Sequence, residues 1–367
     1  MKTVFSTIVF LHGAIHLMGF VKGFKIAQIS NLQTDISPIS GIFWLIGFLL
    51  FAVSAVGLAL DKEFWSYFVV PALIVSAFLV ISTWTDAKYG MIPNVVILIV
   101  VMVSFSSNNM SKMIDRETEE ILGTTKRAES EIITNTDIAE LPEPVQSWIR
   151  STGIIGRPAI TSACLHQKAS MKMKPEQQDW YSAGAIQYTT MNPPAFIWTV
   201  NMKMMPMVNI KGRDKYVEGK GEMLIKMNSL INVVNEKGTR MDEGTLQRFL
   251  GELVWYPSLA LSPYISWEAI DKTSAKATMT YKGTTGSGTF YFNGEGDFVK
   301  FVAMRYKGNK ADAKRYPWIL TVDDYTVFEG IKVPSKMKAT WKLDEGDWTW
   351  LKLEVTSLSF NEKVLTN

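Results

Sequence analysis

Cysteine and histidine are scarce in this chain of 367 residues, which contains one Cys and three His. The single cysteine, Cys164, excludes an internal disulfide framework and any cysteine-rich zinc site. Three histidines leave little room for histidine-based metal chemistry. The net charge of +3 is small and spread along the chain, so we expect no nucleic-acid partner. We also expect no cofactor, because no glycine-rich loop joins a strand to a helix as a nucleotide site would require.

Charge is largely missing from the first third of the chain. Residues 1–110 carry five Lys and four Asp or Glu, whereas the rest carries 33 basic and 31 acidic side chains. Four apolar stretches here are long enough to cross a bilayer, at about residues 3–21, 40–60, 64–85 and 91–106. The sequence therefore predicts a transmembrane domain at 1–110, a charged connector at 111–150 and a soluble domain at 151–367.

Four spans would place the N-terminus and the soluble domain on the same side of the membrane. The basic residues that flank the spans are nearly equal in number on the two faces, so the positive-inside rule does not decide the orientation. We expect a multi-pass protein of the bacterial inner membrane, with the lipid bilayer as its partner. We expect the soluble domain to be extracytoplasmic.

Two of the three histidines, His12 and His16, lie inside the first predicted span and share one helix face. Ionisable groups at membrane depth usually face a bundle interior, and Asp86, at the end of the third span, is expected at a depth similar to that of His16. These three residues are the candidates for a weak metal, quinone or proton site. We favour the alternative, in which two neutral imidazoles hydrogen-bond to neighbouring helices and Asp86 forms an interfacial pair with Lys88.

From about residue 160, apolar side chains recur at every second position. The clearest runs are 196–204, 275–282, 336–343 and 350–355, and turn sequences rich in Gly, Asn and Asp separate such runs. This alternation is typical of antiparallel strands with one buried face. The predicted fold class is α+β: a membrane bundle of four helices, then a mainly antiparallel β domain. We expect a curved sheet or half-barrel of about eight to eleven strands, although a sandwich fits the same pattern.

One amphipathic helix interrupts the strands. Its apolar stripe runs from Leu246 to Val254 at helical spacing, with Thr245 as the expected N-cap and Pro257 as the stop. We expect this helix, Thr245–Tyr256, to lie against the open side of the sheet and to act as a plug or lid.

Several short segments resemble a known family. They are Arg157-Pro158, Arg213-Asp214-Lys215-Tyr216, Asp242-Glu243-Gly244, the run from Glu252 to Ser258, and the ending Leu358-Ser359-Phe360-Asn361. With the histidine-bearing first span, they resemble an uncharacterised bacterial family, a membrane-anchored domain of unknown function, over about residues 5–106 and 150–361. The resemblance implies a fold similar to the curved-sheet lipoprotein carriers of the bacterial envelope. It implies no activity and no catalytic residues.

Methionine and tryptophan are abundant in the β region. Met lines adaptable apolar surfaces and less often binds soft metals such as Cu(I), while Trp suits both core packing and the mouth of a cavity. Our first hypothesis is therefore non-covalent binding of an apolar or amphiphilic, lipid-like ligand. The candidate lining residues are Trp198, Met202, Met204, Phe249 and Trp255.

An enzyme is the second hypothesis. Paired carboxylates, with an anion held by an arginine such as Arg305, would serve acid–base chemistry. The candidate catalytic residues are Arg213, Asp214, Tyr216, Arg248, Glu252 and Tyr256. A structural role is the alternative, because arginine and glutamate four residues apart form an ion pair on a helix surface. A hydrolase built on His166 is disfavoured, and a structural or sensory module is the third hypothesis.

Overall fold

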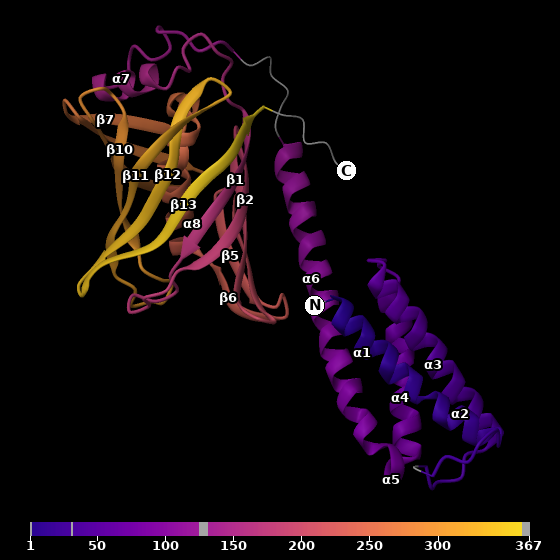
Figure 1. Cartoon of the computed structure of the whole chain (residues 1–367). Coiled ribbons are helices and arrows are strands. Elements are labelled where there is room, and N and C mark those ends of the chain that lie inside the picture. The colour runs from indigo at the N-terminus through magenta and orange to yellow at the C-terminus, as the bar shows by residue number, and fades with distance from the viewer. Residues whose placement is uncertain (1, 31, 125–130, 362–367) are drawn as a thin grey trace. The chain divides into compact units, whose positions relative to one another are not determined.

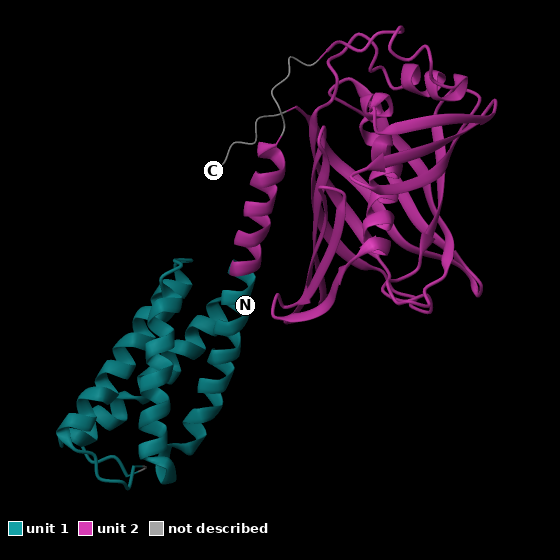
Figure 2. Ribbon diagram, turned by 180° about the vertical axis from the view of Figure 1, so that it is seen from behind, with its two compact units in different colours: residues 1–108 teal, residues 109–367 magenta. Residues whose placement is uncertain are grey.

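The computed structural model describes residues 2–30, 32–124 and 131–361. The chain forms two compact units, residues 1–108 and 109–367 (Figure 2). The first unit is helical, and the second contains the β-sheet. Part of the predicted connector, including Lys126, Arg127 and Glu129, lies outside the described residues.

Four helical stretches are long and apolar enough to cross a membrane, as the sequence predicted. The first combines α1 (Lys2–Ile15) and α2 (Leu17–Gly23), followed by α3 (Pro38–Ala59) and α4 (Trp65–Ser82) (Figure 1). The fourth comprises α5 (Trp84–Ala87), the 3-10 turn Lys88–Gly90 and α6 (Met91–Gly123).

Helix α6 is longer than expected. The sequence placed the end of the fourth span near residue 106, but α6 continues to Gly123. Within the second unit, the apolar side chains on one face of α6 pack against strand β3 (Pro194–Met205): Met110, Ile114 and Ile121 with Ala195 and Ile197. Burial of one apolar face stabilises a helix whose other face is charged, so the start of the predicted connector is helical.

The second unit is built around one antiparallel sheet, which confirms the α+β class. In the described residues, thirteen strands lie in the order β6-β5-β4-β3-β2-β1-β13-β12-β11-β10-β9-β8-β7. The other strands are β1 (Ser162–Met171), β2 (Tyr181–Met191), β4 (Val208–Val217), β5 (Lys220–Met227), β6 (Ile231–Lys237), β7 (Ile265–Asp271), β8 (Ser274–Tyr281), β9 (Thr284–Phe292), β10 (Phe298–Tyr306), β11 (Arg315–Phe328), β12 (Ile331–Leu343) and β13 (Gly346–Phe360).

The sheet curls into a half-barrel around a helix on its concave side (Figures 1 and 2). The expected eight to eleven strands were too few, and the single sheet rules out the sandwich. Edge strand β6 explains part of the difference, because it is exposed at nearly every position and lacks the alternation that identifies a strand. The first and last strands, β1 and β13, pair in the middle of the sheet.

Helix α8 (Thr239–Gly251) connects the two edges of the sheet through 3-10 turns at Glu252–Trp255 and Pro257–Leu261. It begins earlier than the predicted N-cap, Thr245. The cause is the contact with β5, where the carboxylate of Asp242 accepts a hydrogen bond from the Gly221 backbone N–H at 2.8 Å. This bond anchors the first turn of α8 on the sheet.

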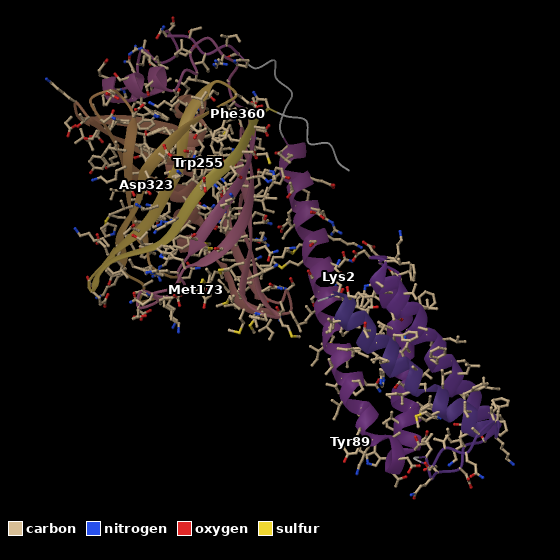
Figure 3. The ribbon with its side chains drawn as sticks, viewed as in Figure 1. Lys2, Tyr89, Met173, Trp255, Asp323 and Phe360 are labelled. Atoms are coloured by element: carbon tan, nitrogen blue, oxygen red, sulfur yellow. The ribbon has the colours of Figure 1, made fainter. Side chains whose placement is uncertain are left out.

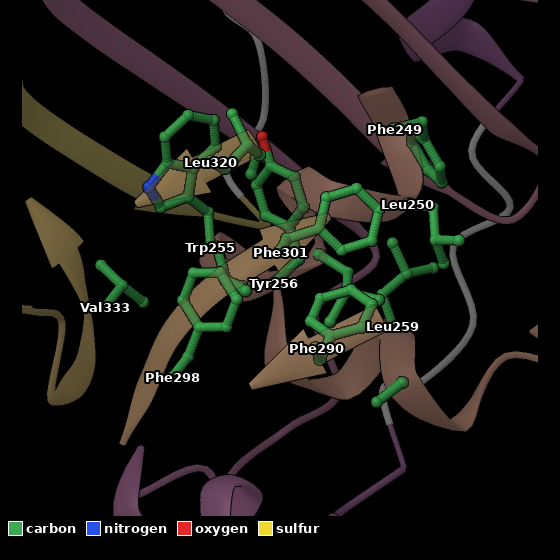
Figure 4. Close-up of a cluster of buried hydrophobic side chains, with 14 of the residues drawn as sticks. Phe249, Leu250, Trp255, Tyr256, Leu259, Phe290, Phe298, Phe301, Leu320 and Val333 are labelled. Carbon is green, nitrogen blue, oxygen red and sulfur yellow. The ribbon is translucent and has the colours of Figure 1, made fainter. Parts of the chain in front are cut away.

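The core of the second unit lies between α8, the 3-10 turns and the concave face of the sheet (Figure 4). Phe249, Leu250, Tyr256, Phe290 and Phe301 are fully buried there. At the end of the sheet near Phe360, α7 (Glu143–Ser151) adds its own buried side chains to the same cluster. The α8 helix thus fills part of the half-barrel with packed hydrophobic side chains.

Candidate functional site

A cavity of about 470 Å³ opens on the concave face of the half-barrel. Typical small-molecule sites occupy roughly 300–1,000 Å³, so this cavity has the size of a ligand site. Its wall contains six tryptophans: Trp198, Trp255, Trp318, Trp341, Trp348 and Trp350. Met171 and Met173 also line it, and Figure 3 shows Met173 at the end of the sheet opposite Phe360. The cavity therefore lies toward the end of the sheet that the core does not fill.

Three of the five predicted lining residues, Trp198, Met202 and Trp255, line the cavity. Trp198 Nε1 donates to Gln167 Oε1 at 2.9 Å, and Trp255 Nε1 donates to the Pro334 carbonyl oxygen at 2.9 Å. These bonds fix both rings in the wall.

The other two predicted lining residues lie elsewhere. Phe249 is fully buried in the core and stacks on Phe196 at 6.3 Å between ring centroids. Met204 is partly exposed beside a register shift between Lys203 and Met205, which interrupts the alternation of β3.

An ion-pair network forms the polar side of the cavity. Arg248 on α8 bonds to Asp214 Oδ2 at 2.6 Å and to Glu252 Oε1 at 2.7 Å. Its Nη2 donates to Gln187 Oε1 at 3.0 Å. Burial opposes the charge of Arg248, but Glu252 and Asp214 outweigh it and raise the pKa of the guanidinium. The network therefore holds one permanent cation between two carboxylates.

Arg213 does not join this network, because adjacent strand residues point to opposite faces of a sheet. It lies on the convex face, where its guanidinium contacts Glu117 of α6 at 3.1 Å and Glu222 at 3.2 Å. Lys215 contacts the same Glu117 at 2.8 Å. These pairs secure the second-unit part of α6 to the sheet.

The two candidate tyrosines are buried. Tyr256 bonds to Thr189 Oγ1 at 3.0 Å, and burial followed by the charge of Glu252 raises its pKa. Tyr216 packs against both Phe196 and Phe249, with ring centroids 6.4 Å and 6.1 Å away, and burial raises its pKa as well. Tyr256 therefore connects to the Arg248 network through Gln187, whereas Tyr216 belongs to the core.

Sequence reasoning missed three polar contributors. Gln187 and Thr189 on β2 complete the network around Arg248 and Tyr256. Lys307, just after β10, lines the cavity with Arg305. Alternate residues of a strand point to the same face, and Ala303, Arg305 and Lys307 follow one another at two-residue intervals. Because Ala303 is buried, this spacing was the sequence signal for the inward orientation of Lys307.

Residues 131–353 match the model of a family of unknown function, DUF6544. This match covers more than half of the chain. The protein belongs to the DUF6544 family. The expected membership of a family of unknown function is thereby confirmed.

All the cavity-lining residues, from Met171 to Leu353, lie within the DUF6544 match. None of the curated proteins compared with the chain matches it. Among solved structures, the chain is similar to a LolA superfamily protein, NE2245 from Nitrosomonas europaea. That alignment has 9% identity and a TM-score of 0.31, and it covers 60% of this chain and 94% of that chain.

Outside the DUF6544 region, His12 and His16 are buried in the interior of the helical unit. His12 Nε2 donates to Asn94 Oδ1 at 2.8 Å, and His16 Nδ1 donates to the His12 carbonyl oxygen at 3.0 Å. The structure does not bring His16 and Asp86 together, because Asp86 accepts a hydrogen bond from the Thr34 backbone N–H at 2.7 Å. Across the described residues, no group of three or more His, Cys, Asp or Glu is arranged to hold a metal ion.

Proposed function

We propose that this protein is an integral membrane protein whose β domain binds an apolar or amphiphilic ligand non-covalently. The supporting observation is the cavity of about 470 Å³ on the concave face, with its wall of tryptophan and methionine. Burial of each ligand methylene in such a cavity would contribute about 0.8 kcal/mol. Methionine adapts to irregular apolar shapes, so the site suits a flexible chain better than a rigid polar substrate.

Helix α8 serves as a plug in this proposal. Leu246, Phe249 and Leu250 on one face of α8 are fully buried in the core, whereas Met241 and Arg248 on another face line the cavity. A helix packed in this way closes one end of the half-barrel and leaves the other end for the ligand. Arg248 compensates one of the two carboxylate charges of Asp214 and Glu252, and this pairing lowers the cost of placing the polar groups beside an apolar ligand.

The proposed location is the bacterial inner membrane, with the β domain on the extracytoplasmic side. Four helical stretches of sufficient length and hydropathy support a multi-pass arrangement. An amphiphile from the surrounding bilayer would then be the nearest available ligand.

The experiment is native mass spectrometry of the purified full chain. We expect one bound amphiphile per chain, and we expect its loss in Ala339→Phe, which places a ring in the cavity from a buried wall position. Lys342→Phe, at an exposed position of the same strand, is the matched control and should keep the ligand. Equal occupancy in the two variants, or no bound molecule in the unaltered chain, would contradict the proposal.

A further inference from the structure

Three tryptophans form a row across neighbouring strands of the cavity wall. Trp318 on β11 pairs with Trp341 on β12, and Trp341 pairs in turn with Trp348 on β13. All three rings line the cavity. Directly opposed residues in an antiparallel sheet place their side chains on the same face, so the three indoles line one surface of the cavity on neighbouring strands.

Two cations lie over this surface. The Arg305 guanidinium lies 4.2 Å from the Trp318 ring centroid and 5.8 Å from that of Trp341. Lys307 Nζ lies 4.5 Å from the Trp348 centroid and 5.4 Å from that of Trp341. Arg305 and Lys307 are two residues apart, which directs both to the concave face. A cation over an aromatic face is attracted to it and keeps its N–H groups available for other partners.

Neither cation has an acidic partner among the described residues. No ion pair within 4 Å joins either side chain to an Asp or Glu of the described residues. Asp214 and Glu252, two acids of the cavity wall whose charges act on Arg305, both bind Arg248. Gly244 of α8 leaves room for Arg305, since a Cβ there would lie 3.2 Å from Arg305 Nη2. Burial lowers the pKa of Arg305 to about 10, so the guanidinium stays charged at neutral pH.

The same region contains hydrogen-bond donors that have no acceptor. In the described residues, the buried atoms Arg305 Nε, Trp318 Nε1 and Trp348 Nε1 lack a hydrogen-bond partner. Buried polar groups are normally paired, and an unpaired buried donor destabilises the folded state. Three such donors beside two cations without an acidic partner suit a ligand that is both negatively charged and rich in acceptor atoms.

We propose that the ligand of the cavity is an anionic amphiphile, and that Arg305, Lys307 and the indole N–H groups of Trp318 and Trp348 bind its phosphate or carboxylate head. This inference rests on the proposed function and names its ligand class. The apolar chain would lie along the methionine and leucine side chains of the wall, such as Met202, Met337 and Leu351. The planar guanidinium of Arg305 can donate two parallel hydrogen bonds to either kind of head.

The test measures displacement of N-phenylnaphthylamine, an uncharged apolar dye, from the full chain in phosphatidylcholine nanodiscs, with empty nanodiscs as the background. The competitors are dodecyl phosphate, dodecanoate, uncharged dodecanol and inorganic phosphate. We expect either anionic amphiphile to compete at least about tenfold better than dodecanol, because hydrogen bonds to charged groups contribute that much or more. The better of the two identifies the head.

Arg305→Gln should remove most of this preference, measured as the affinity for the anionic amphiphile relative to that for dodecanol in the same variant. Lys307→Gln, at an exposed position near the mouth, should reduce the preference severalfold even if Arg305→Gln does not fold. Lys300→Gln removes a cation from the same strand beside Tyr291, outside the cavity wall, and should change nothing.

Several outcomes would overturn the inference. If dodecanol competes as well as the anionic amphiphiles, the site does not select an anionic head group, and the proposed function stays intact. If inorganic phosphate competes as well as dodecyl phosphate, the ligand is not an amphiphile, because the site would then recognise a free anion. Failure of the dye and of every amphiphile to bind would contradict the proposed function itself.

Discussion

Arg248 is the residue on which the polar side of the cavity depends. Its spacing from Glu252 predicted an ion pair, and the pair is present at 2.7 Å. The prediction of a surface pair was wrong, because Arg248 also bonds to Asp214 and Gln187, which come from β4 and β2. A one-turn spacing reveals a local pair, but only the folded sheet reveals which distant side chains bury it.

Arg248→Met should destabilise the protein by about 3–5 kcal/mol, because it leaves two buried carboxylates without their cation. The measurement is the free energy of unfolding of the full chain in urea, followed by tryptophan fluorescence. The control is Lys336→Met, which breaks an ion pair with Asp324 whose side chains are 49% and 52% exposed, and it should cost at most about 1 kcal/mol. Equal effects of the two substitutions would contradict the role assigned to Arg248.

Glu222 on the convex face should make stability depend on acid pH. Burial alone would raise its pKa, but Lys237, Lys215 and Arg213 outweigh burial and lower the pKa from the ordinary value of 4.5. A carboxyl with a depressed folded-state pKa contributes stability above its unfolded pKa, and this contribution is lost as the pH falls through the folded pKa.

We therefore expect Glu222→Gln to destabilise the protein near pH 6 and to have little effect once the pH has fallen below the depressed folded-state pKa of Glu222. Urea midpoints of the two chains, compared across this range, measure the effect. A difference between the two urea midpoints that stays constant with pH would contradict the pH-dependent contribution of Glu222.

At the scale of elements, sequence alternation predicted the antiparallel sheet because most strands have one buried and one exposed face. The start of α8 was misplaced, since contact with β5 rather than a local cap determines it. The end of α6 was also misplaced: the sequence ended the fourth span near residue 106 and predicted a separate juxtamembrane helix, whereas one helix continues to Gly123, and β3 covers its apolar face beyond residue 108. Both errors have the same cause: an element's ends depend on what it packs against, and one sequence does not contain that information.

The contact between α8 and β5 requires glycine at position 221. A Cβ on Gly221 would lie 2.7 Å from the Met241 carbonyl oxygen and 2.8 Å from Thr245 Cβ, and it would also meet Thr245 Oγ1. Gly221→Ala should therefore push α8 from the sheet and destabilise the protein by about 1–3 kcal/mol. Gly184→Ala in β2, where nothing lies within 4 Å of the added Cβ, should be neutral or slightly stabilising. Thermal unfolding of the two variants checks the difference, and similar melting temperatures would refute it.

At the scale of the whole molecule, the cavity could not be read from the sequence. Trp318, Trp341 and Trp348 are visible as aromatic residues, but their alignment depends on two strand pairings. One of these pairings contains a register shift between Ala339 and Thr340, and a one-residue error there would place Trp341 and Trp348 on opposite faces. The four apolar helices were predictable because length and hydropathy are properties of contiguous residues.

The proposed topology can be tested with single cysteines in a Cys164→Ser chain, labelled in intact spheroplasts by a maleimide that does not cross membranes. Lys342→Cys lies on an exposed position of the β domain and should be labelled. Lys88→Cys lies in the 3-10 turn near the start of the fourth helical stretch and should react only after permeabilisation, because consecutive spans alternate sides. Labelling of Lys88→Cys alone in intact spheroplasts would reverse the proposed orientation.

The pairing of β1 with β13 has a consequence for how the protein is made. Ala163 lies opposite Phe360 and Met171 opposite Leu351, so the seam in the middle of the sheet joins the first strand synthesised to the last. While the ribosome adds the intervening residues, β1 presents a row of unpaired N–H and C=O groups that invites pairing with other chains. Nascent chains that stop before β13 should therefore aggregate or be degraded, and the final fifteen-residue strand is the step that completes the half-barrel.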